Sequence, residues 1–434
     1  MSESDPSEPS SLLCQLQFIL DSDPLIDEVG FVHPSQFASI RDSSISVELP
    51  SSDDNIKSKA LEANPTNLAF WSRDHKLGIS THVIHPLYNA AKHAFMSSLM
   101  QYKMLINLHE KKVVLDTESV SSASSSLSDF ESEVMKHSRA LLLLSCDFGT
   151  AWNCRKEVVS KKQKIMLYFD ELKLSTLVLS YSPKSERAWT HRRWVIKMIA
   201  CKCSNLQEVL KNESELAKRI AEKSKMNYRA WNHRCWLVSY MPESQIIDEL
   251  LNNRDWAGLH VADNSCFHYR TRLMTRTLED SWYKQDLKES PSNSTKVYQL
   301  WKDELTWNEV LIKRYIGREA CGSALWLYRR FLSICWIKHF ATRMGGNHAV
   351  LFLDNELQLF RLCTYIPDNV FEDYESQAMF AATYIMWLIK QMNEAGGVEI
   401  QEKVREEIVK VMNKLCPNKA FLWDIVRMKS GRQI

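Results

Sequence analysis

The fold of this 434-residue chain is decided by Ser182-Pro183-Lys184-Ser185-Glu186-Arg187-Ala188-Trp189-Thr190-His191-Arg192-Arg193-Trp194. A Ser-Pro turn signal precedes a tryptophan, and an arginine follows that tryptophan three residues later. The same core of one aromatic residue, two variable residues and arginine returns in four other segments: Trp152 to Arg155, Trp231 to Arg234, Phe267 to Arg270 and Trp326 to Arg329. Self-similarity of this kind is the signature of a repeat architecture.

The spacing of the five cores supports one repeating unit. Their aromatic residues follow one another at steps of 37, 42, 36 and 59 residues. The longest step contains the tract Asp286 to Thr295, rich in Ser and Pro, so removing this insertion restores a period close to the others. We expect a degenerate sixth copy at Pro417 to Trp423, where Val426 stands in place of the arginine.

Each core is predicted to lie on the second helix of a helical hairpin. Apolar residues at three- and four-residue spacing precede the cores, as is typical of amphipathic helices; these stretches are Glu131 to Leu144, Lys164 to Tyr181, Leu206 to Lys223 and Lys302 to Tyr315. A single hairpin cannot bury its apolar face, so neighbouring hairpins must stack. The sequence therefore predicts an all-α fold, a curved α-solenoid.

Composition and charge exclude other classes. Only 11 Gly and 12 Pro are present, too few for the frequent turns of a β-sandwich or barrel. A net charge of +2 gives no basic field for nucleic acid or an anionic membrane. No Gly-rich phosphate loop occurs, and the 11 cysteines show no zinc-ligand spacing. We expect no signal peptide in the acidic N-terminal stretch, and no apolar run is long enough to span a membrane. We expect a cytoplasmic chain with reduced thiols and without a bound metal or cofactor.

Three Ser-rich tracts suggest linkers and divide the chain. They are Asp42 to Asn64, Asp116 to Ser128 and Asp286 to Thr295, and each is predicted to be flexible. The expected organisation is an N-terminal helical extension over 1–128, hairpin repeats over 129–342 with an insertion at about 281–300, and C-terminal hairpins over 343–434.

The repeated residues are predicted to be mainly structural. An aromatic residue and an arginine three positions later share one helical face. We expect Trp152, Trp189, Trp231, Phe267 and Trp326 to fill the core between repeats, and Arg155, Arg192, Arg234, Arg270 and Arg329 to reach acceptors on the adjoining hairpin. His191 and His233 are expected to form interhelical hydrogen bonds. The alternative is that some of these groups line the concave face and meet an anion or a partner.

These repeats resemble those of the α subunits of protein prenyltransferases. The resemblance rests on Trp189 to Trp194, on Asn227 to Trp236, and on five copies in register, and it is strongest from Glu131 to Leu332. Outside the repeats, Ile26 to Gly30 and Lys76 to Gly78 are similar to a narrower group, the protein prenyltransferase alpha subunit repeat-containing proteins.

The resemblance implies a fold, an activity and partners. It implies a right-handed α-α superhelix, crescent-shaped, that wraps a separate β subunit. That subunit, expected to be of the Rab-geranylgeranyltransferase type, holds the catalytic zinc. The heterodimer would transfer a geranylgeranyl group, in preference to farnesyl, from its diphosphate to a C-terminal cysteine of clients such as SNAREs or small GTPases. The present chain would be inactive alone.

The resemblance also implies a small set of site residues. The family pattern Lys-Asn-Tyr falls on Met226, Asn227 and Tyr228, so the tyrosine that approaches the isoprenoid diphosphate is kept while the lysine is replaced. A thioether cannot stabilise charge on a leaving diphosphate. Lys225 is the candidate substitute cation. In the fourth repeat, Asn264 and Ser265 keep the family pair before Phe267, which stands in place of tryptophan.

A second function stays open at this point. A non-catalytic solenoid adaptor, similar to a tetratricopeptide array, would bind peptide or protein partners on its concave face. Met226 in place of lysine favours the adaptor. The core of aromatic residue and arginine, which is not the tetratricopeptide signature, favours the enzyme subunit.

Overall fold

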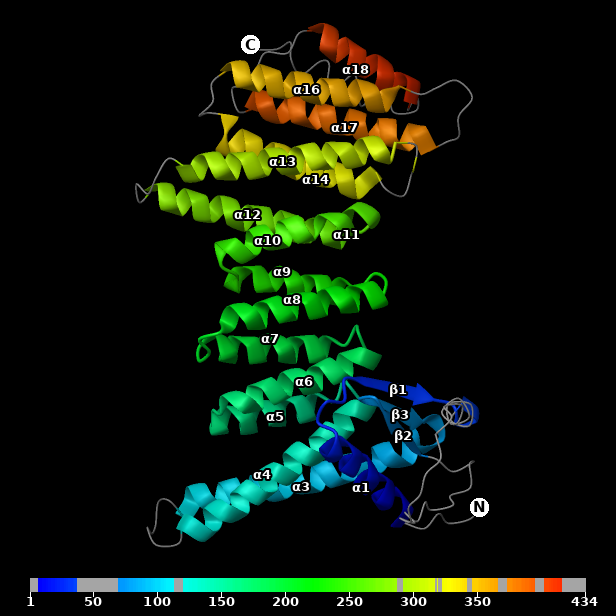
Figure 1. Cartoon of the computed structure of the whole chain (residues 1–434), viewed down its shortest axis with the longest axis vertical. Coiled ribbons are helices and arrows are strands. Elements are labelled where there is room, and N and C mark those ends of the chain that lie inside the picture. Colours follow the sequence, from blue (N-terminus) through cyan, green and yellow to red (C-terminus); the bar gives the residue numbers. More distant parts are fainter. Residues whose placement is uncertain are drawn as a thin grey trace, which may run out of the picture. The chain divides into compact units, whose positions relative to one another are not determined.

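The computed structural model describes residues 7–36, 69–112, 120–286, 292–316, 318, 322–341, 346–365, 373–394 and 402–415. These residues are mainly α-helical, which confirms the all-α class (Figure 1). They divide into two compact units. The first comprises residues 1–209 and 215–233, and the second comprises 210–214 and 234–434. The division falls inside the segment 129–342 that the sequence suggests as one series of repeats.

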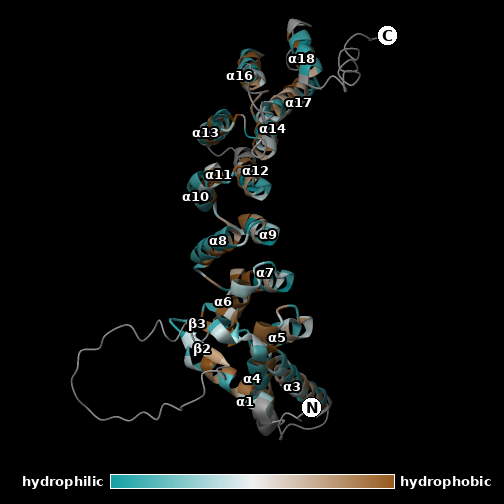
Figure 2. Cartoon of the chain, turned by 90° about the vertical axis from the view of Figure 1, so that its right-hand side faces the viewer, coloured by the Kyte–Doolittle hydropathy of each residue, from teal (hydrophilic) through white to brown (hydrophobic). Residues whose placement is uncertain are grey.

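The first unit contains a terminal helix, a small sheet and a series of hairpins. Its helices are α1 (Ser7–Ser22), α3 (Ile84–Lys112), α4 (Val120–Leu144), α5 (Gly149–Lys162), α6 (Ile165–Tyr181), α7 (Glu186–Ala200), most of α8 (Leu206–Lys223) and the start of α9 (Tyr228–Leu237). A short 3-10 helix, η2 (Thr81–Val83), leads into α3. The apolar colour on α6 in Figure 2 agrees with the burial of Leu172, Val178 and Leu179.

The second unit continues the same pattern of paired helices. After the end of α9 it contains η3 (Val238–Tyr240), α10 (Glu243–Asn252), α11 (Arg254–Leu259), α12 (Asn264–Asp286), α13 (Ser292–Arg314), α14 (Gly322–His339), α16 (Gly346–Thr364), α17 (Asp373–Glu394) and α18 (Glu402–Leu415). Helices α13 and α14 form one hairpin, and α16 and α17 form another. Each hairpin buries apolar side chains of both its helices, for example Leu311 and Leu325 in the first.

A three-stranded sheet in the first unit was not predicted. Strand β3 (Lys76–Ser80) lies between β1 (Glu28–Val32), which is parallel to it, and β2 (Phe70–Arg73), which is antiparallel. Leu77 and Ile79 are buried, and the amide of Val29 donates to Ser180 Oγ on α6. Runs of four or five residues are too short to show a clear alternation of apolar and polar residues, so such strands are difficult to predict from the sequence.

The sheet also joins the two short sequence matches that lie outside the repeats. Gly30 of the first match is the register partner of Gly78 of the second. The two segments are separated by more than forty residues in the sequence but form neighbouring strands of one sheet. They are therefore parts of the same structural element.

The aromatic residue of every core lies on the second helix of its hairpin, as predicted. Trp152 is on α5, Trp189 on α7, Trp231 on α9, Phe267 on α12 and Trp326 on α14, and all five are buried. Trp152 Nε1 donates to the carbonyl of Cys146 at 2.8 Å, and Trp189 Nε1 donates to that of Pro183 at 3.0 Å. In both repeats the indole therefore bonds the turn that begins its own helix.

One expected linker is wrong in part. Residues Ser121 to Ser128 belong to α4 and are helical, not a flexible tract. Propagating a helix adds one hydrogen bond per residue, so the buried half of α4 extends into this polar stretch. Consequently the expected boundary between 128 and 129 falls inside a helix. Thr295 and its neighbours from Ser292 begin α13. The tract Asp42 to Asn64 and the degenerate copy at Pro417 to Trp423 lie outside the described residues.

Candidate functional site

The start of α9 presents one exposed tyrosine beside one buried asparagine. Asn227 Oδ1 accepts from the amide of Ala230 at 3.2 Å, so it caps the helix. Its Nδ2 donates to the carbonyl of Pro183 at 2.9 Å, which ties the turn before α9 to the turn before α7. Tyr228, the first residue of the helix, is 67% exposed. The buried amide therefore fixes the turn while leaving the tyrosine ring available to a ligand or a partner.

The two residues before Asn227 are exposed and not helical. Met226 has a φ of 54° and is 91% exposed, in the turn between α8 and α9. Lys225 is exposed in the same turn. The thioether of Met226 therefore occupies the place of the family lysine at the surface, with a flexible cation immediately beside it.

Cationic side chains surround the beginning of α7, next to this turn. Glu186 Oε2 accepts from Arg229 Nε at 2.7 Å, and Glu186 Oε1 accepts from Arg193 Nη2 at 3.1 Å. The guanidinium of Arg187 lies close to Gly149, because a Cβ on that glycine would be 3.3 Å from Arg187 Cζ. Burial and the nearby Arg187 lower the pKa of Lys156 below its usual value. One carboxylate thus meets two guanidinium groups, and Arg187 and Lys156 add positive charge to this part of the surface.

The repeated arginines are buried and bond helices next to their own. Arg155 on α5 donates from Nη1 to the carbonyl of Met135 on α4 at 2.6 Å, and from Nη2 to Glu171 Oε1 on α6 at 2.6 Å. Arg192 donates to the carbonyl of Leu172 at 2.7 Å. Each of these arginines therefore bonds the helix before its own, and Arg155 also bonds the helix after it.

Glu171 receives a second partner from the next repeat. His191 Nε2 lies 2.8 Å from Glu171 Oε2, and neither side chain is exposed. Burial alone would raise the pKa of Glu171, but Arg155 and the His191 bond outweigh it and lower the pKa to about 2. Burial lowers the pKa of His191, and Glu171 offsets this only in part. A neutral His191 therefore donates to an ionised Glu171.

The second unit repeats this arrangement with tyrosine in place of histidine. Glu249 accepts from Arg234 Nη2 at 2.7 Å and from the Tyr269 hydroxyl at 2.9 Å. Glu304 accepts from Arg270 Nη2 at 2.6 Å and from the Tyr328 hydroxyl at 2.7 Å.

The last of these carboxylates also accepts from an arginine and a tyrosine. Glu356 accepts from Arg329 Nη2 at 2.6 Å and from the Tyr384 hydroxyl at 2.7 Å. For Glu171, Glu249 and Glu304, the carboxylate joins the arginine of one hairpin to the residue two places after the aromatic position in the next, whereas Glu356 joins Arg329 to Tyr384, which follows no such aromatic residue. Two further residues were singled out in the sequence. His233 is buried on α9, and Asn264 is exposed at the start of α12.

Sequence reasoning missed these glutamates. They are Glu171, Glu249, Glu304 and Glu356, and they lie on α6, α10, α13 and α16, the first helices of their hairpins. The available signal was a carboxylate inside a largely apolar stretch, as Glu171 is in Leu167 to Leu179, where Asp170 and Lys173 are the other charged residues. A charge there is costly unless it is paired, so it indicates a buried partner.

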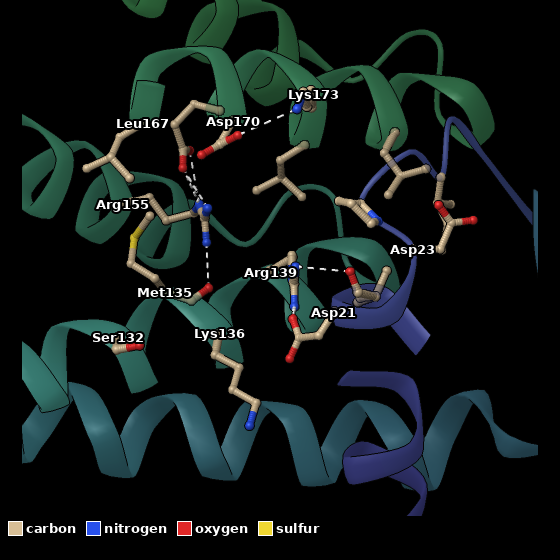
Figure 3. Close-up of a pocket in the computed structure, with 16 residues that line it drawn as sticks. Asp21, Asp23, Ser132, Met135, Lys136, Arg139, Arg155, Leu167, Asp170 and Lys173 are labelled. Carbon is tan, nitrogen blue, oxygen red and sulfur yellow. Dashed lines mark hydrogen bonds and ion pairs between the residues drawn. The ribbon is translucent and has the colours of Figure 1, made fainter. Parts of the chain in front are cut away.

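A cavity of about 460 Å³ lies in the first unit between α1, α4 and α6 (Figure 3). Figure 3 shows Arg155 directed from the cavity wall toward Met135, with Arg139 bonding Asp21 at the opposite side. Arg139 also donates to the carbonyl of Leu20 at 3.5 Å. The charged side chains that line the cavity are therefore largely engaged with one another, so we do not place the functional site here.

Neither a metal-binding cluster nor a membrane-spanning helix occurs among the described residues. Among the described residues, no cluster of three or more His, Cys, Asp and Glu side chains is arranged to hold a metal ion. Within the same part of the chain, no helix has both the length and the apolar character needed to cross a bilayer.

Comparison with known proteins gives the family. The model of the protein prenyltransferase alpha subunit repeat matches residues 168–199 and 210–241, which carry the cores at Trp189 and Trp231. The relatives that match include proteins from human, zebrafish and Xenopus laevis that bear the name protein prenyltransferase alpha subunit repeat-containing protein. The human protein 1 is 30% identical over an aligned length of 313 residues, and the alignment covers 57% of this chain and 76% of that protein.

The other two relatives are matched over shorter regions. The zebrafish (Danio rerio) protein 1 is 28% identical over an aligned length of 261 residues, and the alignment covers 50% of this chain and 60% of that protein. The Xenopus laevis protein 1-B is 28% identical over an aligned length of 230 residues, and the alignment covers 44% of this chain and 52% of that protein. The chain thus spans little more than half of these two relatives. The repeated cores, the buried arginines and the coverage of the human protein lead to one conclusion: the chain belongs to the protein prenyltransferase alpha subunit repeat-containing family.

Proposed function

We propose that this chain is the α-type subunit of a heterodimeric protein prenyltransferase. Family membership supports the proposal, and one structural observation carries it. Tyr228 is exposed at the start of α9 while its neighbour Asn227 is buried and doubly bonded. A tyrosine needed only for packing would be covered. Its exposure on a fixed turn suits contact with a substrate at a subunit interface.

The reaction would be transfer of an isoprenoid, geranylgeranyl in preference to farnesyl, to a cysteine. The bond from the isoprenoid C1 to the diphosphate oxygen breaks as the bond from C1 to the thiolate sulfur forms. Negative charge grows on the leaving diphosphate, so donors placed there favour transfer. The Tyr228 hydroxyl and the Lys225 ammonium are the candidates on this chain, and Arg187 and Arg229 add positive charge to the same unit.

A partner would supply the rest of the active site. We infer a β subunit of the Rab-geranylgeranyltransferase type, carrying the zinc that lowers the pKa of the client thiol. Clients would be cytoplasmic proteins with a C-terminal cysteine, such as SNAREs or small GTPases. The buried glutamate–arginine pairs would give this chain the rigidity to hold such a partner.

Co-expression with a β subunit tests the proposal. We expect a one-to-one complex by light scattering that transfers geranylgeranyl from its diphosphate to a Cys-tailed peptide, and no transfer by this chain alone. A chain that stays a monodisperse monomer with every prenyltransferase β subunit offered contradicts the proposal. If it also binds peptides in that state, the adaptor function replaces the enzymatic one.

A further inference from the structure

Helix α3 carries an exposed apolar stripe, here called the α3 stripe. It consists of Met96, Met100, Met104 and Leu108, which are 45%, 63%, 56% and 53% exposed. Residues four apart lie on one helical face. At 1.5 Å per residue the stripe runs for about 18 Å, or about three turns.

The stripe is not needed to fold the hairpin of α3 and α4 (Figure 1). A different face of α3 provides the core, through the buried residues Leu87, Ala91, Phe95, Leu99 and Tyr102. A helix of this kind normally has polar side chains on its remaining face. Helix α3 therefore exposes a second apolar face, and contiguous exposed apolar residues mark an interaction site.

Charge indicates what covers the stripe. From Ile84 to His109 the sequence contains no Asp or Glu, whereas Lys92 and Lys103 are exposed on α3. Two acids of the neighbouring α4 are already paired, Glu131 with Lys162 and Glu133 with His137. An acidic partner is therefore favoured over a basic one. Methionine side chains are flexible and polarizable, so they adapt to the apolar face of another helix.

We propose that the α3 stripe binds an acidic amphipathic helix of a protein partner. Its apolar residues, spaced three and four apart, would lie along Met96 to Leu108, and its acidic flanks would meet Lys92 and Lys103. This is recognition of a helix by an apolar surface with charge complementarity. The proposal goes beyond the prenyltransferase function and does not depend on it.

A designed peptide provides the first test. The probe is a fluorescent helical peptide of about 18 residues, with Leu along one face and Glu elsewhere. We expect saturable binding to the full chain by anisotropy. The double variant Met100→Glu, Met104→Glu should weaken binding at least about tenfold, because it places like charge and polar groups in the contact. Met166→Glu is the matched control, since Met166 on α6 is 64% exposed outside the stripe, and this variant should bind as the unmodified chain does.

Methionine oxidation provides the second test. It uses the unmodified chain, so its result does not depend on whether a variant folds. In the unmodified chain, dilute peroxide should oxidise Met100 about as fast as Met166, and the acidic peptide should slow only Met100. Circular dichroism should be the same for all variants.

Several outcomes would overturn the proposal. They are no binding, binding that the double variant leaves unchanged, equal binding of a peptide with Lys in place of Glu, and protection of Met100 in the chain without peptide. Protection by anionic phospholipid vesicles but not by peptide would reassign the stripe to a membrane surface and overturn it as well.

Discussion

Arg155 on α5 and Glu171 on α6 form a two-point ion pair that is almost wholly buried. Arg155 Nη2 lies 2.6 Å from Glu171 Oε1, and Arg155 Nε lies 3.0 Å from Glu171 Oε2. The side chains are 6% and 0% exposed. The same relationship recurs at Arg270 with Glu304 and at Arg329 with Glu356. Hairpins of this chain are thus joined by buried charge as well as by apolar packing, and this makes each pair a sensitive point for stability.

The substitution Glu171→Gln should strongly destabilise the first unit. Removing one partner of a buried pair leaves the Arg155 charge uncompensated, which costs about 3–5 kcal/mol. Urea unfolding followed by tryptophan fluorescence measures the change. Glu157→Gln is the control, because Glu157 and its partner Lys161 are about half exposed, and it should cost less than about 1 kcal/mol. Equal effects of the two variants would mean that burial of the Arg155–Glu171 pair does not change its contribution to the free energy of unfolding.

Loss of His191 should flatten the pH dependence of stability. Because the pKa of His191 is lowered in the folded chain, the unfolded chain takes up that proton first as the pH falls. Stability from this group is therefore complete above the unfolded value of 6.5 and decreases below it. Between pH 7 and pH 5, the Tm of His191→Gln should decrease less than the Tm of the unmodified chain. His268→Gln, at an exposed position on α12, should behave as the unmodified chain does. A steeper fall for His191→Gln would contradict the assignment of a neutral histidine.

Glu171 contributes over a more acidic range. Its pKa is about 2 in the folded chain against a usual value of 4.5, so its stabilisation is complete above 4.5 and is lost toward pH 2. The histidine and glutamate effects therefore separate along the pH axis, and titration over both ranges distinguishes them.

Tyr228→Phe should lower isoprenoid transfer without disturbing assembly. The ring stays, so packing and complex formation should be unchanged, while the hydroxyl that would donate to the leaving diphosphate is gone. We expect a fall in kcat of about tenfold or more, as for other removed oxyanion donors, in the complex with a β subunit. Tyr365→Phe is the control, because Tyr365 is also exposed, at 72%, at the end of α16. Unchanged kcat for both variants would leave Tyr228 without a chemical role.

The repeat architecture could be predicted from the sequence, whereas the charge pairs and the sheet could not. The arginine and aromatic positions recur at a regular step, so their helices and their faces follow from periodicity alone. The pairing of Arg155 with Glu171 could not be foreseen in the same way. The glutamate has no recurring motif of its own, and its distance from the arginine changes from repeat to repeat. The strand pairing of Gly30 with Gly78 depends on contact between segments that are distant in the sequence. A local sequence pattern cannot predict such a contact.

The exposure of Tyr228 required the structure for a different reason. Sequence resemblance identifies the Asn227–Tyr228 pair, but whether the tyrosine packs inside or projects outward depends on the turn at Met226. The positive φ of Met226, together with the two bonds of Asn227, directs the chain so that α9 begins with Tyr228 at the surface. A resemblance alone cannot separate these two placements.

Gly322→Ala should destabilise the second unit because α14 and α17 approach closely there. A Cβ on Gly322 would lie 2.6 Å from Phe380 Cδ2 and 2.9 Å from Gln377 Oε1. Gln377 cannot move freely, since its Oε1 accepts from Trp326 Nε1 at 2.9 Å and its side chain is buried. Overpacking of this kind costs about 1–3 kcal/mol, and thermal unfolding should report it as a lower Tm.

Gly258→Ala separates this packing effect from the general effect of replacing glycine in a helix. Gly258 is on α11, and a Cβ there would lie 3.6 Å from Leu311 Cδ2, an ordinary contact. Since alanine favours a helix over glycine by about 1 kcal/mol, Gly258→Ala should be neutral or stabilising. The opposite signs of the two variants then follow from the space around each glycine. If Gly322→Ala were stabilising as well, α14 and α17 would have room to separate, and the bond from Trp326 to Gln377 would not hold them together.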